Sequence, residues 1–156
     1  MGAVDARLAE LGLTLPSVAA PVAVYVPAVQ SGKFVYTSGQ LPFVDGALPT
    51  TGKVGLGAGL VDPADAAGFA QVSALNALAA IGALIGDLDK IERIVKVTGY
   101  VASDPSFTGQ PQVVNGASEI LGEIFGAAGV HARSAVGVAV LPLDSPVELE
   151  LLVELR

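Results

Sequence analysis

The stretch of sequence that decides the fold is HARSAVGVAVLPLDSPVELELLVE, residues 131–154. Small and β-branched residues follow Arg133, and leucine and valine alternate with glutamate after Pro146. Both patterns are typical of strands, so we expect one strand over 133–141 and another over 147–155. The segment between them is rich in proline and short, and we therefore expect the two strands to form a hairpin.

Arg133 is the first candidate for a ligand-binding residue. The chain holds 8 Lys+Arg against 15 Asp+Glu, so an arginine at the start of an apolar strand is conspicuous. A guanidinium can bind a carboxylate through two parallel hydrogen bonds. The alternative is an arginine paired with a surface acid, a contact that contributes little to stability. The local pattern alone favours that alternative.

The composition limits the class of protein. A chain of 156 residues predicts one domain, 1–156, with 1–20 as an N-terminal helical extension. Because 52% of the residues are hydrophobic and only 15% charged, we expect an apolar face to be buried against copies of the chain. The net charge of −7 argues against nucleic acid as a partner. The chain has no cysteine and one histidine, so we expect no metal and no disulfide.

No basic region followed by an apolar run is present at the N-terminus, so we expect no signal peptide. The longest apolar run, 74–86, contains Asn76 and is too short to cross a bilayer. The expected location is therefore the cytoplasm, with no membrane partner.

The remaining elements follow from periodicity, turn residues and helix caps. The Asp62-Pro63 pair is typical of a helix start. We expect an α+β fold in which two main helices cover one face of a largely antiparallel or mixed sheet. The predicted helices are 4–11, 63–85 and 111–125; the predicted strands are 23–30, 33–38 and 91–102, with a loop over 41–61.

Two other motifs are weak. Glycines recur over 52–59, but Lys53 precedes all of them except Gly52, and no Ser or Thr directly follows it, so they do not form a phosphate-binding loop. Ser38 and His131 could belong to a hydrolase triad, yet the residues before Ser38 lack the glycine of a nucleophile elbow. His131 lies two residues from Arg133 and so projects to the same side of an extended chain.

Several motifs together carry a family resemblance. They are Tyr25, Thr37-Ser38-Gly39-Gln40, Val113-Val114-Asn115, Ala132-Arg133-Ser134 and Val147-Glu148-Leu149-Glu150. With these motifs in order and at matching spacing from about Pro21 onward, the chain resembles the Rid (reactive intermediate deaminase) family, also called YjgF-like or L-PSP endoribonuclease-like.

The resemblance implies a chorismate-mutase-like fold and a homotrimer with sites between subunits. It implies that Arg133 binds the carboxylate of a small 2-imino acid, while Glu148 positions the water that attacks the imine carbon. The products would be a 2-oxo acid and ammonia. Further residues that the resemblance places at the site are Tyr25, Ser38, Asn115 and the backbone near Gly39.

The chemistry fits these residue types without any cofactor. An iminium carbon is already electrophilic, so the site has only to hold the carboxylate, place water and accept a proton. In a 133–155 hairpin, Arg133 and Glu148 would be offset by some six residues, roughly 20 Å. We therefore expect the two residues of one site to come from neighbouring chains.

The sequence also departs from the family pattern. Ala135 stands where many deaminase members have cysteine, and His131 stands where proline is common; both would shape the pocket.

Taken singly, Tyr25 could be a strand aromatic, Asn115 a local helix contact and Glu148 an outward acid. The alternative functions are a non-catalytic trimer that binds small carboxylates and, disfavoured by the net charge, an endoribonuclease.

Overall fold

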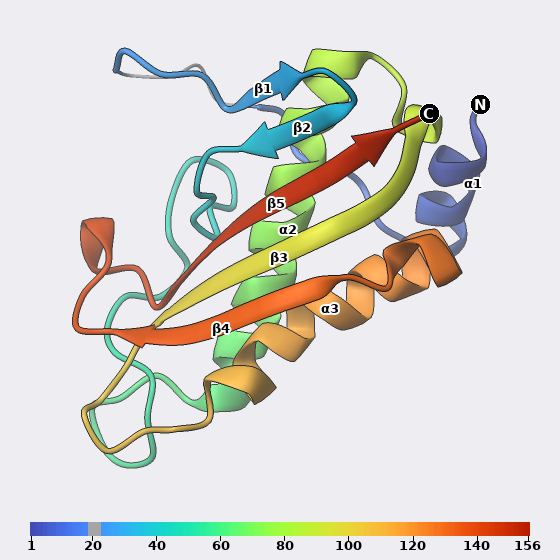
Figure 1. Cartoon of the computed structure of the whole chain (residues 1–156). Helices are drawn as coiled ribbons and strands as arrows, with labels where there is room; N and C mark the ends of the chain where they lie inside the picture. Colours follow the sequence, from blue (N-terminus) through green and yellow to red (C-terminus); the bar gives the residue numbers. More distant parts are fainter. Residues whose placement is uncertain (19–22) are drawn as a thin grey trace.

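The computed structural model of the chain describes residues 1–18 and 23–156. A five-stranded sheet has the strand order β1-β2-β5-β3-β4, and α2 and α3 pack on one of its faces (Figure 1). The helices are α1 (Ala3–Glu10), α2 (Pro63–Ile85) and α3 (Gln110–Phe125). The strands are β1 (Ala28–Ser31), β2 (Phe34–Thr37), β3 (Ile91–Ala102), β4 (Ala132–Val138) and β5 (Val147–Leu155). The predicted α+β fold with a mixed sheet is confirmed.

The predicted hairpin between the last two strands is wrong. β4 pairs with β3 in parallel, and β5 pairs with the other edge of β3 in antiparallel orientation, so β3 separates them. The reason is the helix between β3 and β4: α3 returns the chain to the starting end of the sheet, as a parallel connection requires. The segment 139–146 then crosses the end of β3 instead of turning back on β4.

α2 begins and ends as its sequence predicts. The Asp62 carboxylate accepts a hydrogen bond from the Ala64 N–H (2.8 Å), and Gly86 takes a left-handed conformation after the last turn. Within the described residues, α2 is the one helix that is long and apolar enough to cross a membrane. The apolar run 74–86, which is only part of this helix, was too short to indicate this. Half of its most apolar window is buried inside the structure, as in the core helix of a folded domain.

α1 is fixed to the rest of the domain by polar contacts. The Asp89 carboxylate accepts hydrogen bonds from the Ala3 and Val4 N–H groups at the start of the helix (2.7 and 2.8 Å). These bonds hold the pKa of Asp89 below its usual value. The Arg7 side chain donates to the Glu123 carbonyl at the end of α3 (2.8 Å).

Other predicted elements differ in detail. The first strand was expected from Ala23 but begins at Ala28, and 41–61 forms a loop with isolated bridges. The end of the predicted 1–20 extension and Pro21 fall partly or wholly outside the described residues.

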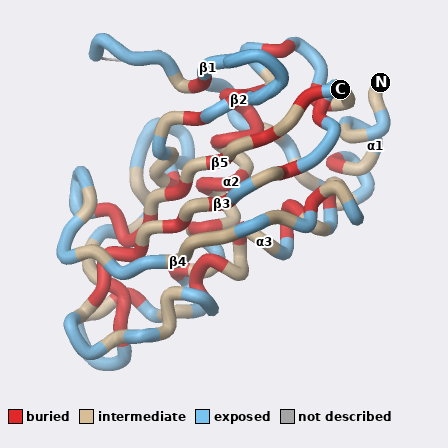
Figure 2. Tube along the Cα trace, in the orientation of Figure 1, coloured by how far each residue is buried: buried red, intermediate tan, exposed pale blue. Residues whose placement is uncertain are grey.

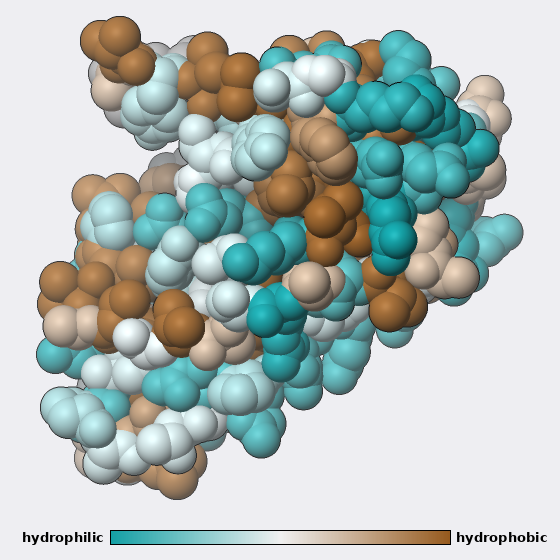
Figure 3. All heavy atoms as spheres, viewed as in Figure 1, coloured by the Kyte–Doolittle hydropathy of each residue, from teal (hydrophilic) through white to brown (hydrophobic). Residues whose placement is uncertain are grey.

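The two faces of the sheet differ in what covers them. Residues facing the helices form the core, among them Val97, Leu149 and Val153, each at most 1% exposed (Figure 2). On the opposite face, hereafter the open face, the described residues place no helix. It carries apolar side chains that remain partly exposed, visible among polar ones in Figure 3. They are Val29, Phe34, Tyr36 and Val136.

Candidate functional site

The Arg133 side chain lies between β4 and α3. Arg133 is level with Val97 of β3, whose side chain faces the core, so the arginine points to the helix side of the sheet. Its Nη1 donates two hydrogen bonds to α3, to Asn115 Oδ1 (2.8 Å) and to Ser118 Oγ (3.1 Å). We call Arg133, Asn115 and Ser118 the arginine cluster.

No acid pairs with Arg133 in the part of the chain that the structure describes. The ion pairs found there join Arg7 to Glu10 and Arg156 to Glu92. A surface ion pair, the alternative that the local sequence favoured, is therefore not formed within these residues. Because its cationic group is half-buried without an anion, Arg133 is suited to receive an external one.

The two residues at which the sequence was expected to depart from the family pattern lie on either side of Arg133 in the sequence. Ala135 is two residues along β4, on the same side of the strand, and packs against the core. His131 precedes the strand, and its Nδ1 lies 3.1 Å from the Ala132 carbonyl, so that nitrogen carries a proton in this contact. A methyl group at 135 leaves more room near the guanidinium than a larger side chain would.

Glu148 lies on the opposite side of the sheet. On β5, Leu149 and its alternate neighbours are buried in the core, so Glu148 and Glu150 project onto the open face. Glu148 is partly buried there, and desolvation, with the negative charge of Glu150, raises the pKa of its carboxyl group. A carboxyl group with a raised pKa can exchange protons closer to neutral pH.

Gly39 makes room for this carboxylate. A Cβ at position 39 would overlap the carboxyl end of the Glu148 side chain, so a larger residue there would displace the carboxylate from this position. Reciprocal backbone hydrogen bonds between Gln40 and Leu149 (2.7 and 3.0 Å) hold the two segments together. We call Ser38, Gly39 and Glu148 the glutamate cluster.

Ser38 attaches the segment that carries Tyr25. Its hydroxyl donates to the Val26 carbonyl (2.6 Å), and its backbone N–H donates to the Pro27 carbonyl (2.8 Å). Tyr25 itself is 55% exposed. Ser38 thus holds the backbone next to Tyr25 near the glutamate cluster.

The two clusters do not meet within one chain. The expected separation of roughly 20 Å rested on the β4–β5 hairpin and is wrong: Arg133 is level with Val97, and Glu148 with Tyr100. Three residues along β3 correspond to only about 10 Å. The side chains nevertheless emerge from opposite faces of the sheet, so one small ligand cannot bind both residues of the same chain.

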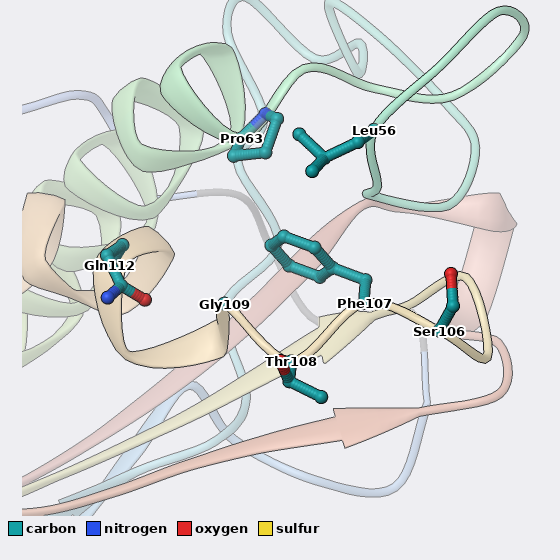
Figure 4. Close-up of a pocket in the computed structure, with 7 residues that line it drawn as sticks. All are labelled: Leu56, Pro63, Ser106, Phe107, Thr108, Gly109 and Gln112. Atoms are coloured by element: carbon teal, nitrogen blue, oxygen red, sulfur yellow. The ribbon is translucent and has the colours of Figure 1, made fainter.

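Two cavities lie elsewhere. One of about 380 Å³ lies between the first residues of α2 and α3, where Phe107 faces Leu56 and Pro63 (Figure 4). Another, of about 560 Å³, lies between the N-terminal segment and α2. No residue that the sequence predicted for the site lines either cavity. Among the described residues, no group of three or more His, Cys, Asp or Glu could hold a metal ion.

Sequence reasoning missed two polar partners. Ser118 lies three residues after Asn115, which places both on one face of α3. Ser118 could have been identified as a hydroxyl on the Asn115 face of the helix that can accept a hydrogen bond from the Arg133 guanidinium. Tyr100 donates to Glu150 (2.8 Å) on the open face, and this bond is the main reason that the pKa of Tyr100 is raised. The pairing of β3 with β5 was needed to find that contact.

Comparison with known proteins identifies relatives of this chain. The family model described as "YjgF/chorismate mutase-like, putative endoribonuclease" matches residues 5–155. Protein TCP17 of Trypanosoma cruzi is 44% identical over 156 residues, which cover 99% of this chain and 96% of that protein.

Solved structures agree with the family match. The protein Atu1372 of Agrobacterium tumefaciens, whose function is unknown, is 45% identical with a TM-score of 0.89, covering 99% of this chain and 93% of that one. TdcF of Escherichia coli, solved with bound serine, is 25% identical with a TM-score of 0.62, covering 92% and 95%. The match over nearly the whole chain and the shared fold show that this protein belongs to the YjgF/chorismate mutase-like family, the Rid family.

Proposed function

We propose that the protein hydrolyses small 2-imino acids at sites formed between copies of the chain. The observation that carries the proposal is the half-buried Arg133 guanidinium, held by α3 and without an acidic partner among the described residues. In this proposal it binds the substrate carboxylate. Family membership and the serine bound to TdcF support a small amino-acid-like ligand.

Glu148 of a neighbouring chain would position the attacking water. Water adds to the iminium carbon, both of its protons move in turn to the nitrogen by way of the carboxylate, and the carbon–nitrogen bond breaks. The iminium acid and one water thereby become one 2-oxo acid and one ammonium ion. The raised pKa of Glu148 suits a group that accepts and returns a proton. The residues named here need no cofactor for these steps.

A trimer would bring the two clusters together. The clusters lie on opposite faces of one sheet, and the open face exposes apolar side chains that a second copy could cover. We therefore propose a homotrimer, in the cytoplasm, as its working form.

The test generates 2-iminopropanoate enzymatically and follows its decay with and without the protein. Wild type should accelerate the decay, and Arg133→Ala should lower kcat/KM at least about 30-fold, because a buried charge partner is worth roughly 2–5 kcal/mol. The matched control is Arg93→Ala, which removes an exposed arginine from the neighbouring strand and should change little.

The same assay separates the rival functions. If wild type leaves the decay unchanged but still binds 2-oxobutanoate through Arg133, the protein is a carboxylate-binding trimer and the catalytic proposal is wrong. RNA cleavage by nuclease-free preparations would instead favour an endoribonuclease.

A further inference from the structure

The hydrogen bonds of Arg133 determine which edge of the guanidinium is free. The group has five N–H donors: two on Nη1, two on Nη2 and one on Nε. Nη1 makes two hydrogen bonds, to Asn115 Oδ1 and Ser118 Oγ. No partner of Nη2 or Nε is present among the described residues. Nη1 is therefore committed to α3, and three donors remain for a ligand.

A carboxylate can bind a guanidinium bidentately in two ways. It can bind end-on, through Nη1 and Nη2, or side-on, through Nη2 and Nε. End-on binding would compete with the two bonds to α3, whereas side-on binding leaves them intact. The arrangement on α3 thus selects the side-on geometry.

We propose that Ser118 is a positioning residue that, together with Asn115, presents the Nε–Nη2 edge of Arg133 to the carboxylate of the ligand. The inference rests on the proposed function, because it assigns Ser118 a part in binding that substrate class. One acceptor would let the guanidinium rotate about its single contact. Two acceptors one helical turn apart fix the plane of the guanidinium. The group is then already oriented for bidentate binding, and less rotational freedom is lost when the carboxylate binds.

The unpaired nitrogens of the arginine cluster are all donors. A guanidinium cannot accept a hydrogen bond, so the Asn115 atom that faces it is the amide oxygen, and the NH₂ group points elsewhere. The free donors of Arg133 match a ligand group that only accepts, such as a carboxylate.

The experiment compares Ser118→Ala with Ser118→Thr, which keeps the hydroxyl, in two measurements. Calorimetric titration with 2-oxobutanoate, the product, should show Kd raised about five- to tenfold in Ser118→Ala and within about twofold of wild type in Ser118→Thr. In the imine assay KM should rise by the same factor while kcat stays within about twofold. The control Ser31→Ala, which changes an exposed serine at the end of β1, should change neither value.

A second ligand separates positioning from a general loosening of the fold. Binding of 2-oxobutanamide, which lacks the carboxylate, should be equally weak in wild type and in Ser118→Ala. If 2-oxobutanoate binds Ser118→Ala as tightly as wild type, the positioning role is wrong, whatever the imine assay shows. If wild type binds the product and Ser118→Ala binds it less well, yet no variant accelerates imine decay, Ser118 positions Arg133 in a binding protein and only the proposed catalysis fails. Wild type that does not bind 2-oxobutanoate would overturn both.

Discussion

Glu148 shows how a neighbouring side chain sets the proton affinity of a candidate catalytic group. Its carboxyl is partly desolvated, and the like charge of Glu150 on the same face makes ionisation still less favourable. Both causes raise its pKa above the ordinary value. If ionised Glu148 positions the water, activity should fall as the pH drops through that raised pKa.

Glu150→Gln tests this coupling. The substitution removes one of the two causes, so the pKa of Glu148 should fall and the residue should stay ionised at lower pH. The acidic limb of the kcat/KM profile should therefore move to lower pH, while the amide oxygen of the new side chain can still accept the Tyr100 hydrogen bond. Glu154→Gln, farther along β5, serves as the control and should leave the limb in place. An unchanged limb in Glu150→Gln would contradict the coupling.

At the scale of single residues, the sequence identified the charged members of the two clusters but not what holds them. Arg133 and Glu148 were predicted from motifs because chemistry restricts their identity. Ser118 was not predicted, because a serine hydroxyl can bond to many kinds of group and its spacing in the sequence indicates none of them. Contacts of this kind depend on how elements pack.

At the scale of elements, local sequence signals predicted the individual helices and strands but not how the strands pair. The start of α2 at Asp62-Pro63 and the full extent of β3 were predicted because caps and alternation act over a few residues. The predicted β4–β5 hairpin was wrong because the sequence of an apolar strand does not indicate which strand it pairs with. The connection through α3, which makes β3 and β4 parallel, decides the pairing.

The contact between α2 and α3 gives a prediction at this scale. A Cβ at Gly116 would overlap the backbone of Ala67, whereas nothing lies within 4 Å of a Cβ at Gly122 on the same helix. Gly116→Ala should destabilise the fold by about 1–3 kcal/mol through overpacking. Gly122→Ala, its matched control, should be neutral or stabilising by up to about 1 kcal/mol, because alanine favours helix. Urea unfolding monitored by circular dichroism measures both; equal effects would refute the close packing.

At the scale of the whole molecule, the proposed function makes the two clusters of one chain two separated half-sites. The arginine cluster lies on the helix side and the glutamate cluster on the open face, so β4 and β5 cannot bring them together without a second copy. In this proposal only the assembly is active. A subunit that lacks one of the two residues can still form an active site with a neighbour that supplies that residue.

Mixed assemblies test this directly. Arg133→Ala and Glu148→Gln chains, each inactive alone, are co-expressed with different tags and purified through both. If each site takes Arg133 from one chain and Glu148 from its neighbour, random assembly at equal ratio leaves about a quarter of the sites intact. Purification through both tags removes assemblies of a single kind, so imine hydrolysis should reach at least that fraction of the wild-type rate.

In the control, Arg133→Ala is paired with the double variant Arg133→Ala/Glu148→Gln. These assemblies contain no Arg133 and should stay inactive. Mixed assemblies of the two single variants that are no more active than their parents would show that the half-sites do not combine between chains.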